Sequence, residues 1–240
     1  MGEIVPGSDP IDVGACVKRG FELTKRHFGT IFLVGLTYFG VSIGASMIIG
    51  MIVPAVGAGA NQASSESLTA VAVVSQILLQ VLSIYLSLGL VRIGLNLVSG
   101  KEVSVGQLFG EGSKLLPAIG ASIILGFMVV IGFILLIVPG FYLLLRYGQF
   151  MNGMVDRNLG VIDSLKYSSS ITTNNRLNLF LLMILAIGIV IAGALALLVG
   201  LIFAYPVVWL SWVVAYRWMQ YGGRAVEDHP GTTTPLLSSV

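Results

Sequence analysis

Long apolar runs separated by short polar segments dominate the chain. No residue from 28 to 60 carries a permanent charge, and a second uncharged run joins Arg176 to Arg217. About 20 apolar residues in a helix suffice to cross a bilayer, so the second run is long enough for two crossings, which Pro206 is expected to divide. The pattern predicts an all-α, polytopic membrane helix bundle with six transmembrane helices, over residues 28–56, 68–98, 115–138, 140–156, 177–204 and 207–221.

The fourth and sixth predicted helices are the weakest. Pro139 to Arg157 and Pro206 to Arg224 are both 18-residue intervals, which corresponds to about 27 Å of helix. Because that length barely crosses a bilayer, a re-entrant or tilted segment is the alternative for each.

A short amphipathic segment precedes each predicted hairpin and begins at a residue suited to cap a helix: Asp12, Ser104 or Asp163. Their side-chain oxygens accept hydrogen bonds from first-turn amides. In the first segment, residues 11–26, Val13, Cys16, Val17 and Phe21 form an apolar stripe opposite charged residues, which is typical of a helix in the headgroup plane. A proline then marks the turn of each hairpin: Pro54, Pro139 and Pro206. We interpret this order as a degenerate threefold hairpin repeat with cytoplasmic amphipathic elbow helices.

Composition agrees with a membrane protein. The 240 residues are 56% apolar and only 10% charged, whereas soluble domains carry about 25% charged residues. One cysteine and two histidines exclude an internal disulfide and a Cys/His metal cluster, and a net charge of +2 gives no reason to expect nucleic acid. We expect no cofactor and a single membrane domain over 1–224, followed by a flexible cytoplasmic tail over 225–240.

The basic residues predict the orientation. With six spans, ten of the 13 fall on one side, and the opposite loops hold none. Lys and Arg near the membrane mark the cytoplasmic side. We therefore expect a multi-pass protein of the cytoplasmic (inner) membrane with both termini in the cytoplasm and with the anionic inner leaflet as a contact. The ten are Lys18, Arg19, Lys25, Arg26, Lys101, Lys114, Arg157, Lys166, Arg176 and Arg224.

The other three basic residues, Arg92, Arg146 and Arg217, each lie within the apolar run of a returning helix. A charge at the bilayer centre costs at least about 2.5–3.5 kcal/mol, so it usually faces protein, water or a partner. One interpretation is a contact with an anion or a lipid phosphate. The structural alternatives, which we favour, are snorkelling to the headgroups and pairing with helix-terminal carbonyls or with Asp156.

Two further polar groups stand out. Asn152, Asp156 and Arg157 form a candidate cytoplasmic polar cluster at the end of the fourth helix, although an ordinary boundary cluster explains them as well. Hydroxyl and amide side chains fill residues 168–176, which could hydrogen-bond neighbouring helices or form a hydrated elbow. We favour the elbow.

Small residues predict helix packing. Gly40 and Gly44 are four residues apart in the first helix, and four more follow at the same spacing in the fifth: Gly188, Ala192, Ala196 and Gly200. Spacing by four places such residues on one face, where another helix can approach closely. The partner helix could belong to this chain, to a second copy or to another membrane protein.

Catalytic groups are absent from the predicted spans. They hold no His, Cys or paired carboxylates, and arginine is no general base. We therefore expect no enzymatic activity. The leading hypothesis is a membrane scaffold or accessory subunit, and the alternative is a small transporter or channel for an anionic or lipid-like solute that uses the three arginines.

Residues 138–180 hold a spaced set of eleven positions: Pro139, Gly140, Tyr142, Leu143, Arg146, Tyr147, Asp156, Ser164, Leu165, Ser168 and Thr172. With these positions the segment resembles part of a poorly characterised prokaryotic membrane family, which includes the membrane domain of some glycerophosphodiester phosphodiesterases. The resemblance implies a helical membrane bundle and no established activity. This chain lacks the phosphodiesterase domain of the enzyme-linked members, so that activity is not carried over.

Overall fold

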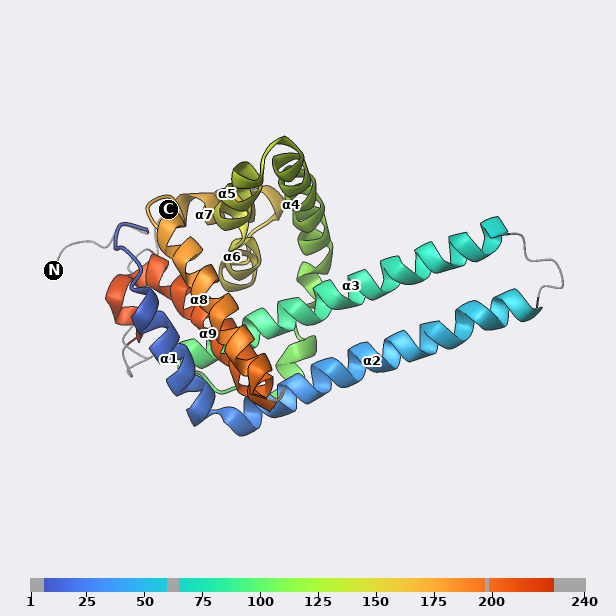
Figure 1. Ribbon diagram of the computed structural model, residues 1–240, viewed down its shortest axis with the longest axis horizontal. Helices are drawn as coiled ribbons and strands as arrows, with labels where there is room; N and C mark the ends of the chain where they lie inside the picture. Colours follow the sequence, from blue (N-terminus) through green and yellow to red (C-terminus); the bar gives the residue numbers. More distant parts are fainter. Residues whose placement is uncertain (1–6, 60–64, 197–198, 227–240) are drawn as a thin grey trace.

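The computed structural model in Figure 1 describes residues 7–59, 65–196 and 199–226. Within these residues every regular element is helical, which confirms the predicted all-α class. Residues 227–240, most of the predicted tail, lie outside this part. The elements are α1 Val13–Arg26, α2 Phe28–Gly59, α3 Ser65–Val98, the 3₁₀ turns η1 Val105–Phe109 and η2 Gly112–Lys114, α4 Leu115–Leu135, α5 Ile137–Tyr147, α6 Phe150–Arg157, α7 Val161–Ile171, α8 Arg176–Leu195, α9 Val199–Tyr221 and the 3₁₀ turn η3 Gly222–Val226.

Three helical hairpins follow one another along the chain: α2–α3, α4–α5 and α8–α9. Each comes after a shorter element, namely α1, η1 with η2, or α7, and this order matches the predicted unit. The hairpins do not stand side by side. In Figure 1, α2–α3 extends far to the right of the body, whereas α4 and α5 point upward.

The prediction of a single fourth helix over residues 140–156 is wrong. The chain forms α5 and then α6, with a break at Gly148 and Gln149. The 11 residues of α5 rise about 16 Å, roughly half of a hydrocarbon core. The turn before α5 is made by Leu136, whose backbone is extended (φ −164°, ψ 155°). Pro139 lies in the first turn of α5, where its missing amide leaves no hydrogen bond unmade.

The predicted boundary at Pro206 is also wrong. Helix α8 ends at Leu195, and α9 begins at Val199 and continues through Pro206. Helix α2 likewise continues past Pro54 to Gly59. Within the described residues, five helices rather than six are long and apolar enough to cross a membrane: α2, α3, α4, α8 and α9.

The three amphipathic segments differ from one another. Asp12 caps α1 as predicted, accepting a hydrogen bond from the Ala15 amide at 2.9 Å. The second segment forms 3₁₀ turns, and Ser104 makes no side-chain cap bond. The third begins after Gly160, so that Asp163 lies in the first turn of α7 instead of capping it.

Helix α1 packs along α9 with a buried face that matches the predicted stripe only in part, since Val13 and Val17 also pack against the core. Cys16 and Leu23 are buried against the core, whereas Phe21 is 55% exposed. A Cβ on Gly20 would lie 2.9 Å from the Val207 carbonyl oxygen, so a glycine is needed for this close approach. Helix α1 therefore packs against α9, whereas we expected its apolar stripe to lie on the lipid headgroups.

The two ends of α1 lie at opposite ends of α9. The Gly7 amide, before α1, donates to the Met219 carbonyl at 2.7 Å, and Phe28, just after α1, stacks on Phe203 with ring centres 4.5 Å apart. Lys25 and Arg26 therefore lie toward the α8–α9 turn. This contradicts the predicted arrangement, in which these cations and that turn lie on opposite faces of the membrane.

The core forms around α9, in whose most apolar window 50% of the residues are buried. The second half of α3 crosses α9, and Gly94 lies against Trp209 and Val213. Leu210 and Tyr216 of α9 are completely buried, as are Leu86, Leu88 and Ile93 of α3. The polar contacts described next lie around this core.

Candidate functional site

Arg92, on α3, forms an ion pair with Glu111, which lies between η1 and η2. Arg92 Nε is 2.5 Å from Glu111 Oε1, and Lys114 Nζ is 2.6 Å from the other carboxylate oxygen. Arg92 Nη2 also donates to the Val155 carbonyl at 2.9 Å. That carbonyl belongs to the last turn of α6, where carbonyls have no partner within the helix. Arg92 thus neutralises a carboxylate and satisfies a helix terminus.

Arg217, on α9, forms a two-pronged ion pair with Asp156 on α6. Arg217 Nη2 lies 2.9 Å from Asp156 Oδ1, and Nη1 donates to Oδ2 at 3.0 Å. The side chains are only 11% and 14% exposed. Paired N–H···O bonds of this kind are among the strongest polar contacts in proteins. The pairing with Asp156 that the sequence left open is therefore found for Arg217.

Gln220 and two tyrosines surround this pair. Gln220 Nε2 donates to Asp156 Oδ2 at 2.9 Å and to the Tyr167 hydroxyl at 2.8 Å. The Tyr216 hydroxyl donates to the same carboxylate oxygen at 3.0 Å. Burial raises the pKa of Tyr167, so its phenol stays neutral. The network links α6, α7 and α9 and leaves the Asp156 carboxylate well satisfied.

Arg146, in the last turn of α5, has different surroundings. Its Nε donates to Ser169 Oγ at 2.7 Å, and its Cζ lies 6.0 Å from the centre of the Tyr142 ring. Arg176 of α8 donates to the Tyr142 hydroxyl at 2.6 Å, with its Cζ 4.8 Å from the same ring. No carboxylate within the described residues pairs with either arginine. Two guanidinium groups therefore share one aromatic ring without a compensating negative charge.

The hydroxyl-rich run over residues 168–176 is only in part the hydrated elbow that we favoured. Ser170, Thr173 and Asn174 are exposed, whereas Ser168 on α7 and Thr172 at its C-terminal cap are completely buried. Both donate to the Arg146 carbonyl at 3.0 Å, and Ser168 Oγ accepts from the Gln149 amide at 3.1 Å. They supply hydrogen bonds that the backbone loses where α5 breaks from α6. This is the interhelical bonding that the sequence offered as the alternative.

The predicted polar cluster does not come together as one site. Asp156 pairs with Arg217, whereas Arg157 lies 4.5 Å over the ring of Tyr167. Asn152 Nδ2 donates to Gln149 Oε1 at 2.5 Å, and its Oδ1 is buried without a partner in the described part of the chain. The three residues share α6 but contact different neighbours.

The small residues predicted to pack against another helix also have different surroundings. A Cβ on Gly40, Gly44 or Gly188 would have no other atom within 4 Å. Gly200 lies on α9 and not on α8, and both Ala192 and Ala196 are exposed. The prediction of one four-residue face on one helix is therefore wrong. The close approach is made across the turn, where a Cβ on Gly200 would lie 2.8 Å from Gly193 Cα.

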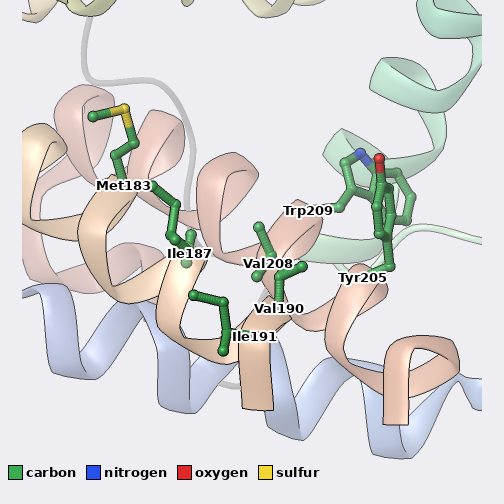
Figure 2. A pocket seen from close by; sticks show the side chains of 8 residues that line it. Met183, Ile187, Val190, Ile191, Tyr205, Val208 and Trp209 are labelled. Carbon is green, nitrogen blue, oxygen red and sulfur yellow. The ribbon is translucent and has the colours of Figure 1, made fainter. Parts of the chain in front are cut away.

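An apolar groove of about 370 Å³ runs between α8 and α9. Figure 2 shows side chains of both helices converging on it. None of the three arginines lines the groove. Its lining includes Met183, Ile187 and Val190 from α8 and Tyr205, Val208 and Trp209 from α9.

Three residues with central roles were missed by the sequence analysis. Glu111 lies three residues before Lys114, and Gln220 lies three after Arg217, so in each case the helical i, i+3 spacing could have indicated a contact. Asn175 is completely buried, and its side chain accepts from the Ile11 amide at 2.7 Å and donates to the Gly7 carbonyl at 3.2 Å. Nothing in the local sequence pairs Asn175 with a segment more than 160 residues away.

The three arginines thus occupy two kinds of environment. Arg92 and Arg217 are ion-paired, and adjacent residues of α6, Val155 and Asp156, contact them. Arg146 lies apart, beside Arg176. No family model, no curated protein and no solved structure matches this chain, so no relative assigns a function to these groups.

Proposed function

We propose that this chain is a membrane-embedded scaffold or accessory subunit without catalytic activity of its own. The α2–α3 hairpin carries the proposal. In their most apolar windows only 11% of α2 and 17% of α3 is buried, against 22% in the spans that contain α4 and α8 and 50% of α9. The hairpin also extends away from the other helices (Figure 1). Helices that associate in membranes bury packed faces against one another. A long hairpin with so little burial supports a partner outside the chain.

Small residues on α2 indicate where such a partner would lie. Gly40 and Gly44 are one turn apart, and a Cβ on either would meet no atom within 4 Å. Backbones approach closely at small residues with this spacing, because no side chain separates the helices. The proposed partner is a transmembrane helix, from a second copy or from another membrane protein.

Enlarging that face tests the proposal. Gly40→Ile with Gly44→Ile should convert the associated protein to a monomer in mild detergent, measured by light scattering after size-exclusion chromatography. Folded yield should not change, because the added side chains meet nothing within the chain. Gly126→Ile on α4 is the matched control, since Gly126 is equally uncontacted. A wild-type protein that purifies as a stable monomer, with nothing bound, would overturn the scaffold role.

We infer further that the protein lies in the cytoplasmic (inner) membrane with both termini in the cytoplasm. The five apolar helices of the described residues make it a multi-pass membrane protein by length and hydropathy. Because five crossings alone would leave the two ends on opposite sides, this topology also requires one of the shorter segments to return the chain across the membrane. The hydrogen bond between Gly7 and Met219 supports a shared side for the two ends, because it joins the start of the described chain to the end of α9. Reporter proteins fused at either end should both be cytoplasmic, and opposite locations would exclude this topology.

A small transporter or channel for an anionic or lipid-like solute is the second candidate function. One observation favours it: Arg146 and Arg176 both lie within 6.0 Å of the centre of the Tyr142 ring, and no carboxylate of the described residues pairs with either. Arg146→Gln should then abolish flux and leave folded yield unchanged. Arg92→Gln and Arg217→Gln should instead lower the yield. Arg217→Gln leaves the Asp156 carboxylate without its cation, and Arg92→Gln leaves Glu111 with Lys114 alone and removes the donor to the Val155 carbonyl. Full flux in Arg146→Gln would exclude this function.

A relationship to the membrane domain of glycerophosphodiester phosphodiesterases also remains a proposal. It is supported by contacts between motif positions, two of which join residues more than 20 positions apart in the sequence. Ser168 and Thr172 donate to the Arg146 carbonyl, and Arg146 lies beside Tyr142. Four of the motif positions thus lie together, and no phosphodiesterase activity follows from this.

A further inference from the structure

We propose that Arg146, Arg176 and Tyr142 form a binding site for one anionic phospholipid, whose headgroup phosphate lies between the guanidinium groups and whose acyl chain follows α8 toward the α8–α9 groove. This site rests on the membrane location proposed above but not on the scaffold role. It also gives Arg146 a role in lipid binding, whereas Arg92 and Arg217 form ion pairs within the protein.

The charge balance of the contacts distinguishes this site. Arg92 and Arg217 each face a carboxylate within 3.0 Å. Arg146 and Arg176 contact a serine hydroxyl and a phenol, both uncharged. Their terminal nitrogens keep unused donors, and no other described residue supplies an acceptor beyond these two. Guanidinium groups bind phosphate through paired N–H···O bonds, so a phosphate is the ligand that satisfies these unused donors.

The placement of the two arginines makes the site accessible. Both are partly exposed, and Tyr142 between them is 40% exposed. Ser169 fixes the Arg146 side chain from α7, and Tyr142 fixes Arg176 from α5. The donors are therefore held by three different helices before any ligand arrives, which lowers the entropy lost on binding.

The surface beyond the charges is apolar along one line of α8. Phe180, Met183, Ile187 and Val190 follow Arg176 at intervals of four, three, four and three residues, which places all of them on one face of the helix. Met183 lies seven residues from Arg176, or about 10 Å along the axis. At Met183 the face enters the groove of Figure 2, which accepts an apolar chain. A charged end followed by an apolar track fits a phospholipid better than a free anion.

The test compares lipids bound to the full-length protein by native mass spectrometry from mild detergent. Wild-type protein should retain phosphatidylglycerol over phosphatidylcholine, and Arg146→Gln with Arg176→Gln should weaken this retention by about tenfold or more. Arg157→Gln is the matched control, because Arg157 is an exposed arginine that also lies over a tyrosine ring. Ile187→Trp, which narrows the groove, should weaken phosphatidylglycerol retention while both arginines remain.

Three results would overturn the site. An equal loss of phosphatidylglycerol retention in Arg157→Gln and in the double variant would indicate diffuse attraction to charged lipid. Displacement of phosphatidylglycerol by an equal concentration of inorganic phosphate would show that the ligand is the free anion. Equal retention of the two lipids by the wild-type protein would exclude the site even if the variants did not fold. Oligomeric mass measured in the same samples separates these results from failure of the scaffold role.

Discussion

Arg217 and Asp156 are 61 residues apart in the sequence and meet in a two-pronged ion pair that joins α9 to α6. The carboxylate also accepts hydrogen bonds from Tyr216 and Gln220. Because both charges are nearly buried, each depends on the other for neutralisation. This pair holds the broken α5–α6 segment to the core helix.

Removing one partner of the pair should destabilise the fold. Arg217→Gln leaves the Asp156 carboxylate buried without its cation, which costs about 3 kcal/mol or more. The free energy of unfolding, followed by tryptophan fluorescence during SDS titration, measures the loss. Arg224→Gln, at an exposed arginine in η3, should have almost no effect. Equal stabilities for the two variants would show that the pair contributes little.

The sequence predicted the long helices well because hydrophobicity alone defines them. The charge-free run after His27 corresponds to α2, and residues 68–98 fall within α3. The breaks were not predictable in this way. Leu136 is apolar and turns the chain, whereas Pro206 lies within a continuous helix. The pattern of hydrophobic residues does not reveal a change in backbone conformation inside an apolar run.

The candidate site was predicted in part. Residue type and depth identified the three arginines, and Asp156 was among the partners considered. Which arginines are ion-paired depends on contacts that the sequence does not indicate. Glu111 lies 19 residues after Arg92, and Ser169 lies 23 residues after Arg146. Such contacts are set by how helices cross and not by spacing along one helix.

Gly89 should tolerate no side chain. A Cβ there would overlap the Leu108 carbonyl of η1, and backbone cannot move aside as a flexible side chain can. Gly89→Ala should therefore lower the free energy of unfolding by at least about 2 kcal/mol. In Gly35→Ala, on α2, the new methyl group meets no atom within 4 Å, so stability should be unchanged or slightly raised. Similar losses in both variants would contradict the close contact between α3 and η1.

Cys16 should be unreactive in the folded protein. It is completely buried on α1, and burial, with a smaller contribution from the Asp12 carboxylate, raises the pKa of its thiol to about 12. Thiolate is the reactive form, so maleimide labelling should stay slow between pH 7 and pH 9 and become complete in denaturing detergent. Cys16→Ser with Phe21→Cys places a thiol at an exposed position of the same helix, and its labelling should be fast and rise with pH. Rapid labelling of native Cys16 would show that α1 separates readily from α9.

The break between α5 and α6 should depend on two hydroxyl groups, one on α7 and one at its C-terminal cap. Ser168 and Thr172 both donate to the Arg146 carbonyl, and Ser168 also accepts from the Gln149 amide. Thr172→Val preserves shape but removes one donor, and we expect a loss of about 1–3 kcal/mol in the free energy of unfolding. Ser168→Ala with Thr172→Val should lose more, because the carbonyl and the amide then lack both side-chain partners in an apolar environment. Ser170→Ala is the control: its exposed hydroxyl bonds only within α7, so the same unfolding measurement should show little change. If the double variant were as stable as this control, the break would have to be held by the ion pair of Asp156 instead.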